Sequence, residues 1–273
     1  MSNKQITDFN NAVWAHYDQH ARHELPWREA EPDGTFDPYK VWVSELMLQQ
    51  TQVNRVLPKY VQFLQLFPTV EALAATELGE VLVAWQGLGY NRRAKYLWQA
   101  AQAIMQTHGG VVPDTMVQLI ALPGIGRNTA GAIIAYAFNR PEPFVETNVR
   151  SVYFHHFFTD KPTVADKEVL SLLTQTLSRT NPREYYWALM DYGTYLKRQG
   201  HGTISQSRHY TKQSKFEGSL RQVRGRIVKL LAQQRMSHAA LINELADDRA
   251  PEVLASLKKE GLIRLHDGQY RLA

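Results

Sequence analysis

Glu45 is the residue of this sequence best placed to act as an acid. It stands among Val41, Trp42, Leu46 and Leu48 in a stretch with helical periodicity, so the predicted helix is otherwise apolar. An apolar setting raises the pKa of a carboxyl group, which suits a general acid. A single glutamate on a helix is more often a solvent-exposed residue, so this assignment depends on the motif around it.

A glycine-rich turn, Leu122-Pro123-Gly124-Ile125-Gly126, lies between two helical stretches. Two glycines two positions apart permit a tight turn and expose backbone N–H groups beside the positive end of the next helix. Such a nest binds an anion, and a DNA phosphate fits it without any reading of base sequence. The alternative is a plain turn between helices. The Leu-Pro-Gly-Ile-Gly form favours a helix-hairpin-helix. We expect it to contact DNA through Leu122, Gly124, Gly126, Asn128 and Thr129.

The chain resembles the helix-hairpin-helix DNA glycosylases, and among them the MutY-type adenine DNA glycosylases. The resemblance covers about residues 8 to 197. It rests on the hairpin and on four further blocks in the family's order and spacing, Leu25–Arg28, Pro38–Glu45, Met47–Val53 and Gly87–Tyr90.

The resemblance implies an all-α fold of two helical lobes, with double-stranded DNA and the active site in the cleft between them. We expect residues 1–29 to form an N-terminal helix that packs with the second lobe, and 30–140 to form a six-helix barrel that includes the hairpin. Residues 141–215 then form the second lobe with a basic loop, and 216–273 form a small winged-helix (α+β) module.

Removal of a base from deoxyribose is glycoside hydrolysis, in which two carboxylates can divide the work. By the resemblance, Glu45 protonates a ring nitrogen of the departing adenine, and Glu146 holds the place of the family's aspartate, which supports the cationic sugar. The extra methylene moves the charge by about one C–C bond, so Glu146 either does the same task in a reshaped site or marks a changed substrate. A third possibility is that Glu146 only caps a helix. Asn148 is expected to cap or orient this loop.

Further DNA contacts also follow from the resemblance. Strand-cutting relatives carry at Asn128 a lysine that forms a Schiff base, so this chain is expected to be monofunctional and to leave an abasic site. Gln50 would fill the gap left by the flipped base, and Tyr90 would wedge beside the opposite base. As alternatives, Gln50 is an exposed helix residue and Tyr90 a core aromatic. Further DNA contacts are expected at Thr51 and Arg92, with Arg93 and Lys95 as additional phosphate contacts.

The elements that must position these residues follow from apolar periodicity. Helices are predicted over 7–20, over 38–56 as one helix, from Val70 with Thr69 as its cap, and over 92–107 and 128–138, with no run of alternating strands before residue 260. In the C-terminal region we expect helices at 220–233, after a Ser237 cap, and at 250–260, then a hairpin turning at Asp267-Gly268. A winged-helix module of this plan either binds DNA or packs on a neighbour.

Composition narrows the function classes. The chain has 273 residues and no cysteine, which excludes disulfides, thiol catalysis and cysteine-ligated zinc or iron–sulfur sites. It has no apolar run of membrane-spanning length and begins without a signal-peptide pattern, so a soluble, cytoplasmic protein is expected, associated with the nucleoid if it is prokaryotic. Net charge is +5, yet residues 205–235 alone carry +7. Such local basicity is typical either of a phosphate contact or of a solvated linker, and 205–215 is the best linker candidate.

Two departures from the family pattern bear on the function. Most of the family has a four-cysteine iron–sulfur loop near residue 197, and this chain resembles the clusterless branches, so no cofactor is expected beyond a monovalent cation at the hairpin. A metal site at His155, His156, His201 and His209 is disfavoured by their spacing. The MutY-type oxidised-guanine domain is replaced by 216–273. The main hypothesis is therefore a monomeric adenine glycosylase. The alternatives are a glycosylase for thymine or uracil opposite guanine or for a modified base, and a non-enzymatic DNA-binding protein.

Overall fold

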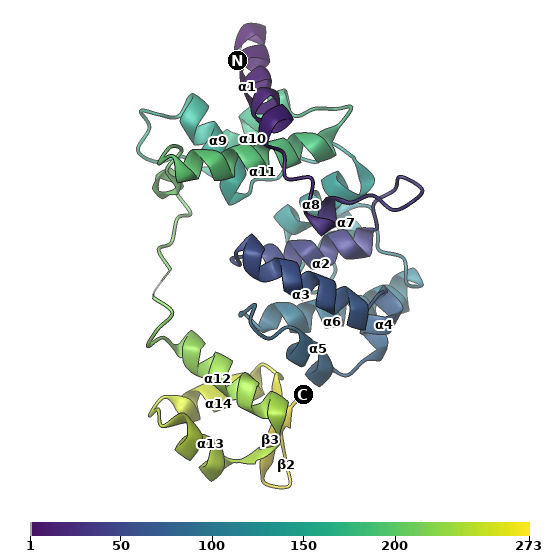
Figure 1. The fold of residues 1–273 in the computed structure, drawn as a ribbon, viewed down its shortest axis with the longest axis vertical. Coiled ribbons are helices and arrows are strands. Elements are labelled where there is room, and N and C mark those ends of the chain that lie inside the picture. Colours follow the sequence, from purple (N-terminus) through teal and green to yellow (C-terminus); the bar gives the residue numbers. More distant parts are fainter. Residues whose placement is uncertain (1, 214) are drawn as a thin grey trace. The chain divides into compact units, whose positions relative to one another are not determined.

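The computed structural model describes residues 2–213 and 215–273. Met1, in the expected N-terminal domain, and Ser214, in the expected linker, lie outside the described residues. The expected all-α fold with a small C-terminal α+β module is confirmed, because the chain is mostly helical and its named strands lie only within 236–272 of the described residues. Figure 1 shows the elements in chain order. None of the described helices is both long and apolar enough to cross a membrane.

The chain divides into two compact units. The first comprises Met1–Trp42, Asp114–Ile120 and Ile125–Lys212, and the second comprises Val43–Pro113, Ala121–Gly124 and Gln213–Ala273. Helix α2 (Pro38–Leu48) runs from the first unit into the second. The expected domain boundaries at 30, 141 and 216 stay predictions. Both helices that flank the hairpin turn group with the first unit, and the C-terminal module groups with residues 43–113.

The first unit is built around one long helix. Its elements are α1 (Asn3–His20), η1 (Pro26–Arg28), α7 (Met116–Ile120), α8 (Arg127–Phe138), α9 (Thr147–Phe157), α10 (Asp166–Thr176), α11 (Pro182–Arg198) and η2 (Ile204–Gln206). Helix α11 packs against α1, α8 and α9 over an aromatic core in which Phe144 and Tyr186 stack with ring centroids 4.0 Å apart. A Cβ at Gly193 would lie 2.3 Å from the Asn148 carbonyl oxygen, so only glycine permits this approach of α11 to α9.

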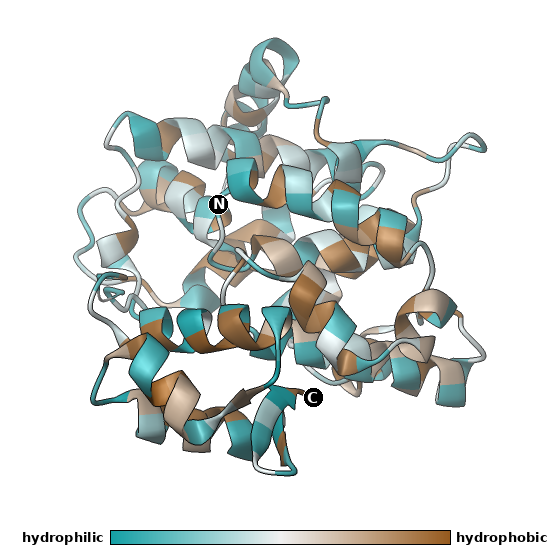
Figure 2. Ribbon diagram, turned by 60° about the horizontal axis from the view of Figure 1, so that its bottom comes forward, coloured by the Kyte–Doolittle hydropathy of each residue, from teal (hydrophilic) through white to brown (hydrophobic). Residues whose placement is uncertain are grey.

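The second unit joins short helices to the C-terminal module. Its elements are α3 (Val53–Leu66), α4 (Val70–Ala75), α5 (Leu78–Ala84), α6 (Arg92–His108), α12 (Leu220–Gln233), β1 (Met236–Ser237), α13 (His238–Leu245), α14 (Ala250–Lys259), β2 (Ile263–His266) and β3 (Gln269–Leu272). Helix α6 packs on α4 and α5. Hydrophilic and hydrophobic residues alternate around the helices in Figure 2, as expected for helices with one buried face. The caps predicted at Thr69 and Ser237 are confirmed, since both side chains accept a backbone N–H.

The single helix predicted over 38–56 is wrong. Helix α2 ends at Leu48, Gln50 adopts the left-handed conformation at φ 54°, and α3 begins at Val53. A left-handed residue cannot continue a right-handed helix, and it costs free energy unless neighbouring structure holds it. The apolar periodicity runs through the break because both helices bury side chains, which is why the sequence did not reveal it.

The winged-helix prediction for 216–273 agrees with the observed elements. The sheet order is β1-β3-β2, and Asp267 and Gly268 turn the hairpin with φ 48° and 73°. Strand β1 was not predicted, because two residues are too few for an alternating pattern. Helix α12 and strand β3 contact α5, and a Cβ at Gly79 would lie 3.1 Å from the Ala273 carbonyl oxygen. The structure therefore shows the module packed on a neighbouring helix, and DNA binding by the module stays a prediction.

An ion pair anchors the N-terminal segment of the first unit. Arg28 (8% exposed) donates to Asp191 (4% exposed) through two hydrogen bonds of 2.8 and 2.9 Å, and Arg22 donates a third of 2.7 Å. Burial alone would raise the pKa of Asp191, but hydrogen bonding and charge from Arg28, with charge from Arg22, lower it below its ordinary value. A depressed folded-state pKa stabilises the fold above the unfolded-state pKa, and this contribution is lost as pH falls through the folded-state value.

We expect Asp191→Asn to lower the free energy of unfolding at pH 7 by about 3 kcal/mol, because it leaves two guanidinium groups without their carboxylate partner. The deficit should shrink below about pH 4, where the wild-type carboxylate begins to protonate. Urea unfolding across pH measures both effects. Asp114→Asn is the matched control, since its pair with Arg140 is half-exposed and should matter by less than about 1 kcal/mol. Equal losses in the two variants would contradict the assignment.

Candidate active site

Glu45 lies on α2 with a half-buried side chain. Its neighbours Trp42, Val43, Leu46 and Met47 are almost fully buried, so the helix presents this carboxylate from an apolar framework, as the sequence predicted. The helix ends three residues later at Leu48. Glu45 belongs to the second unit and Glu146 to the first.

Glu146 occupies the N-cap position of α9 but makes no capping hydrogen bond through its side chain. The carboxylate is half-buried, and burial raises its pKa above the ordinary value while the charge of Arg150 opposes this. Arg150 is itself engaged by Asp166 through two hydrogen bonds of 2.7 Å. Glu146 therefore stands where a helix-capping acid would stand, but its side chain does not form the capping hydrogen bond.

Asn148 lies within the first turn of α9 and not at its cap. Its amide nitrogen lies 3.5 Å from the sulfur of Met190, and its buried Oδ1 has no hydrogen-bond partner among the described residues. A buried amide oxygen without a donor is costly, so this group is available to a donor that the protein itself does not supply. Its expected role in DNA binding stays a prediction.

The hairpin joins α7 and α8 as predicted. Gly124 has φ 75°, and a Cβ there would lie 2.4 Å from the Cβ of Tyr96, so glycine is required on both counts. Gly126 is the N-cap of α8, and a Cβ built there would meet nothing within 4 Å. The first backbone N–H groups of a helix have no partner within it, which is what an anion site at this end requires. Leu122 and Thr129 are buried, and their expected DNA contacts stay predictions.

Asn128 has a structural partner that sequence reasoning missed. Its amide nitrogen donates to the Val145 carbonyl oxygen at 3.0 Å, directly before Glu146. The side chain thus ties the first turn of α8 to the segment that carries the second carboxylate. A long-range contact of this kind leaves no signal in local periodicity.

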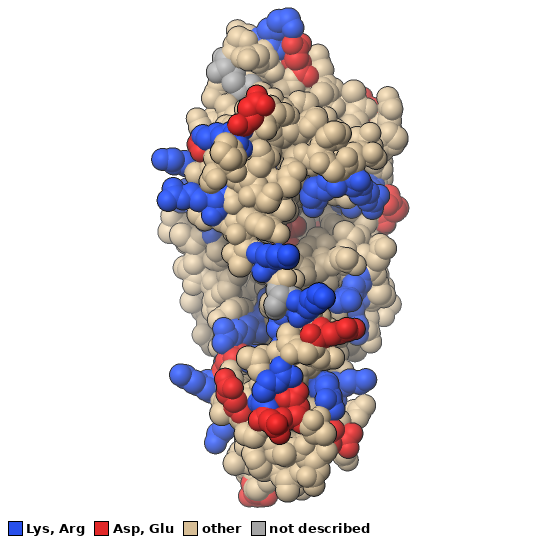
Figure 3. Space-filling model, turned by 90° about the vertical axis from the view of Figure 1, so that its left-hand side faces the viewer, with Lys and Arg blue, Asp and Glu red and all other residues tan. Residues whose placement is uncertain are grey.

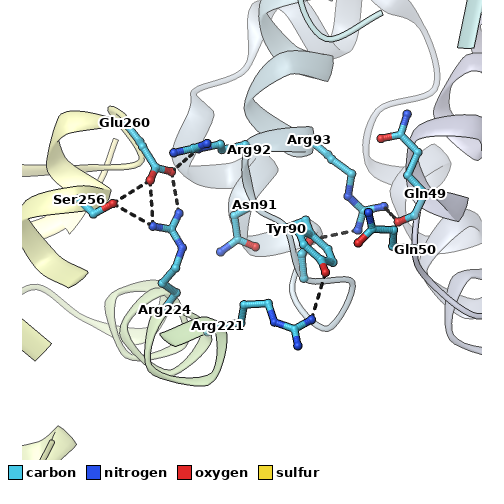
Figure 4. Close-up of a pocket in the computed structure, with 12 residues that line it drawn as sticks. Gln49, Gln50, Tyr90, Asn91, Arg92, Arg93, Arg221, Arg224, Ser256 and Glu260 are labelled. Atoms are coloured by element: carbon cyan, nitrogen blue, oxygen red, sulfur yellow. Dashed lines mark hydrogen bonds and ion pairs between the residues drawn. The ribbon is translucent and has the colours of Figure 1, made fainter. Parts of the chain in front are cut away.

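Arg93 holds the two segments that were predicted to probe the duplex (Figure 4). Its guanidinium donates at 2.6 to 3.0 Å to the carbonyl oxygens of Leu46, Met47 and Gln49 at the end of α2, and at 3.0 to 3.1 Å to those of Leu88 and Gly89 in the loop before α6. Burial lowers the pKa of Arg93 to about 10, so the group remains charged at neutral pH. The expected phosphate contact is wrong for Arg93, because the side chain is buried and used inside the protein.

Gln50 and Tyr90 are both held in the left-handed conformation, with φ 54° and 48°. Tyr90 is exposed (39%), which excludes the core alternative, and Gln50 is exposed beyond the end of its helix. Thr51 is half-buried and lies 3.1 Å from Arg93, so it supports the loop from inside. Non-glycine residues in this conformation persist only where surrounding contacts determine them, and such positions are concentrated at functional sites.

The C-terminal module reaches the same loop. Arg221 of α12 donates to the Tyr90 hydroxyl at 3.0 Å, and Gln213 donates to both Tyr90 and Gln50. Arg92 is exposed but pairs with Glu260 at 2.8 Å, and Lys95 donates to the Glu260 backbone oxygen. In the lower part of Figure 3, which holds this module, basic side chains lie next to acidic ones. The basic count of 205–235 had marked Arg221 in the sequence, but not its partner.

The basic loop of the first unit is held by hydrogen bonds. Val164 donates to Gln206 at 2.7 Å and accepts from Arg208 at 2.9 Å. The nearby histidines pack against one another, with the ring centroids of His155 and His201 5.1 Å apart. Burial lowers the pKa of His156 to about 4. Among the described residues no group of three histidine, cysteine or acidic side chains is placed to hold a metal ion.

Comparison with known proteins places these features in a family. The model of the HhH-GPD superfamily base excision DNA repair protein matches residues 43–177. Proteins named adenine DNA glycosylase are similar in Mycolicibacterium smegmatis (34% identity, 93% of this chain and 92% of the relative) and in Homo sapiens (37%, 69% and 36%). A further relative of that name, from Buchnera aphidicola subsp. Baizongia pistaciae, is 33% identical over 69% of this chain and 52% of its own length. The chain thus spans about half the length of several of these relatives.

Solved structures share the fold. A thermostable thymine-DNA glycosylase has a TM-score of 0.61 at 24% identity, covering 70% of this chain and 87% of the other. A trapped endonuclease III–DNA covalent intermediate has a TM-score of 0.58 at 19% identity, covering 79% of this chain and 91% of the other. These likenesses concern architecture alone. With the near full-length similarity to the mycobacterial relative, they lead to one conclusion: the chain belongs to the HhH-GPD superfamily of base excision DNA repair proteins.

Proposed function

We propose that the protein is a monofunctional adenine DNA glycosylase that hydrolyses the N-glycosidic bond of a mispaired adenine in duplex DNA. The observation that carries this proposal is the 34% identity over 92% of a relative named adenine DNA glycosylase. Structures of other family members in complex with DNA support duplex DNA as the partner. A monomer acting at chromosomal DNA suffices for this reaction.

The chemistry divides between the two carboxylates. Glu45 in its protonated form donates a proton to a ring nitrogen of adenine, so that the base leaves neutral. The bond between C1′ and the base nitrogen breaks, and the deoxyribose passes through an oxocarbenium-like state. Glu146 in its ionised form stabilises that positive charge. A water molecule then adds to C1′, and its proton passes to the Glu45 carboxylate, which restores the acid. The products are free adenine and an abasic site, and no cofactor takes part.

Base flipping precedes this step. The duplex must be opened at the target, at a cost of a few kcal/mol of unstacking, and Gln50 and Tyr90 are the side chains that we assign to that gap. Their fixed left-handed backbone suits this task, because residues that are already ordered lose less conformational entropy when DNA binds. The backbone N–H groups at Gly126 and the start of α8 supply the phosphate contact, for which a monovalent cation is a further candidate ligand.

The first test is base release from end-labelled duplexes with adenine opposite guanine, adenine opposite oxidised guanine, thymine or uracil opposite guanine, and no mispair. We expect release from an adenine mispair, and a rate lower by about 100-fold or more in Glu45→Gln, because general acid catalysis contributes at least that factor. Glu77→Gln, an exposed glutamate of the same unit, is the control and should match wild type. Release from another base alone, or an unaffected Glu45→Gln, would refute the proposal.

Glu146 gives a second prediction. Glu146→Gln should lower the single-turnover rate about 100-fold by removing the charge that stabilises the sugar cation, whereas Glu146→Asp should retain most of the rate. Because burial raises its pKa, the wild-type rate should fall on the acid side through a pKa above the ordinary glutamate value of 4.5. Glu142→Gln serves as the control, since Glu142 is used in the fold through its backbone oxygen. A wild-type rate in Glu146→Gln would contradict this role.

Monofunctionality is tested by reductive trapping. A strand-cutting glycosylase forms a Schiff base that borohydride reduces to a stable protein–DNA adduct. We expect no adduct from the wild-type protein on a cleavable duplex, and intact strands until the abasic site is treated with alkali. A trapped adduct mapped to any lysine would show that the protein cuts the strand as well.

A further inference from the structure

Three arginines form a row across the C-terminal sheet, and the hydrolysis described above uses none of them. Arg264 of β2 and Arg271 of β3 lie directly opposite each other, so their side chains project from the same face. Arg235 immediately precedes β1, and the β1–β3 register continued by one residue places it opposite Arg271. Because β3 lies between β1 and β2, the order across the sheet is Arg235, Arg271, Arg264.

The row lies on the solvent-facing side of the sheet. Strand alternation places apolar residues, mostly buried or half-buried, on the other side: Met236, Ile263, Leu265, Tyr270 and Leu272. Strand β3 contacts α12, and Figure 1 shows the helices of the module on one side of the hairpin. Arg235 and Arg264 are exposed and Arg271 is half-buried. The row is therefore accessible to a partner from solvent.

The side chains of these three arginines form no hydrogen bond or ion pair within the part of the chain that the structure describes. Every other arginine of the module has a partner in the protein: Arg221 the Tyr90 hydroxyl, Arg224 the Glu260 carboxylate, Arg226 the Glu244 backbone oxygen and Arg249 the Asp247 carboxylate. Like charges directly opposite on neighbouring strands destabilise a sheet. The row therefore lowers the stability of the free protein, and a bound polyanion would offset that loss.

The three strands contribute no carboxylate to this face. The next positions along it hold Ser237, Gln269 and His266. The only acidic residue of the hairpin, Asp267, lies at the turn, where its carboxylate is 2.9 Å from the His266 ring nitrogen. The described strands thus give the arginines polar neighbours but no competing anion.

The width of the row favours a polymer over a single anion. Neighbouring strands lie about 4.8 Å apart, so three arginines side by side span roughly 10 Å. That distance is about three steps of a DNA strand, at roughly 3.4 Å of helix axis for each step. Guanidinium groups also match phosphate oxygens, because they present two N–H donors in one plane. The arrangement fits consecutive phosphates of a nucleic-acid backbone.

The row lies close enough to the Tyr90 loop for one duplex to reach both. Glu260 pairs with Arg92 at 2.8 Å, and Arg92 follows Tyr90 by two residues. Arg264 follows Glu260 by four residues, which is at most about 14 Å of extended chain. The row is therefore within about one helical turn of duplex, roughly 34 Å, from the Tyr90 loop.

We propose that the outer face of the C-terminal sheet is a second DNA-binding surface, on which Arg235, Arg271 and Arg264 hold the phosphate backbone of the duplex that flanks the target site. The inference rests on duplex DNA as the partner, which is part of the proposed function, and not on which base is released. Phosphate contacts carry no base information, so this surface adds affinity that is independent of sequence.

The test is the affinity of the full chain for a duplex of about 30 base pairs without a mispair, measured by fluorescence anisotropy between about 50 and 200 mM salt. The slope of log affinity against log salt should fall by about 0.9 for each of the three arginines replaced by glutamine, and so by nearly three in the triple variant. The triple variant should melt at the wild-type temperature or above it, because the row of like charges is gone. A lower melting temperature would assign the arginines to the fold and overturn the proposal.

Arg226→Gln is the matched control. It removes one positive charge from the same module, at an exposed arginine that already donates to the Glu244 backbone oxygen, and it should leave the salt slope unchanged. A fall in slope equal to that of each row variant would reduce the effect to net charge and overturn the proposal. An unchanged slope in the triple variant would also overturn it, and would leave the row to another polyanion such as an acidic protein segment.

A second measurement locates the contact. The chain has no cysteine, so Gln269→Cys places a single thiol on the face that carries the row. Labelled with a thiol-specific photocrosslinker, this variant should crosslink to duplex DNA within about one helical turn of an adenine–guanine mispair. Asn243→Cys, exposed on α13, is the control and should crosslink far less. Equal crosslinking from the two positions would contradict a binding surface on the sheet.

These measurements separate the binding surface from the proposed function, because none of them requires base release. A reduced salt slope in the row variants, together with no base release by the wild-type protein from any duplex, would contradict the proposed function alone. Base release from an adenine mispair, together with wild-type slopes in all row variants, would overturn the binding surface alone.

Discussion

The buried guanidinium of Arg93 is the interaction on which the probing surface depends. It gathers carbonyl oxygens from the end of α2 and from the loop before α6, and so brings together two segments about 40 residues apart in the chain. Only arginine has enough donors in a rigid planar arrangement for this, and a lysine ammonium would satisfy at most three acceptors. Because the carbonyl groups replace water around a buried cation, the contact offsets the strain of two left-handed residues, Gln50 and Tyr90.

Two successive arginines of α6 act in opposite directions. Arg93 points inward and orders the loop, whereas Arg92 points outward and pairs with Glu260 of the C-terminal module. Glu260 also binds Arg224 on α12, the helix whose Arg221 reaches Tyr90. These contacts connect α6 to the C-terminal module through Glu260, and the module to the Tyr90 loop through Arg221. The same loop is held by Arg93 of α6. A module packed in this way contributes to the site through geometry as well as through charge.

The sequence predicted what depends on local pattern. Periodicity, helix capping and turn formation each depend on residues that are close together in the sequence. For this reason the predictions agree with the structure for helix α12, for the caps at Thr69 and Ser237, and for the hairpin at Asp267-Gly268. The end of α2 at Leu48 was missed, because the segment around Gln50 is held in part by a distant arginine, which donates to the Gln49 carbonyl oxygen. The same limit explains the wrong expectation for Arg93. Two adjacent basic residues look alike in a sequence, and only tertiary packing decides which one is buried.

The basic residues of the chain also show that tertiary contacts decide the use of a side chain. The basic segment 205–235 suggested a surface for phosphate, and part of it does remain exposed. Yet Arg224 is used against Glu260 and Arg221 against a tyrosine hydroxyl, so these charges act first within the protein. Charge placed in this way is already ordered before DNA arrives, and less side-chain entropy is lost on binding. Counting arginines therefore overstates long-range attraction, whereas the contacts that orient them indicate where recognition takes place.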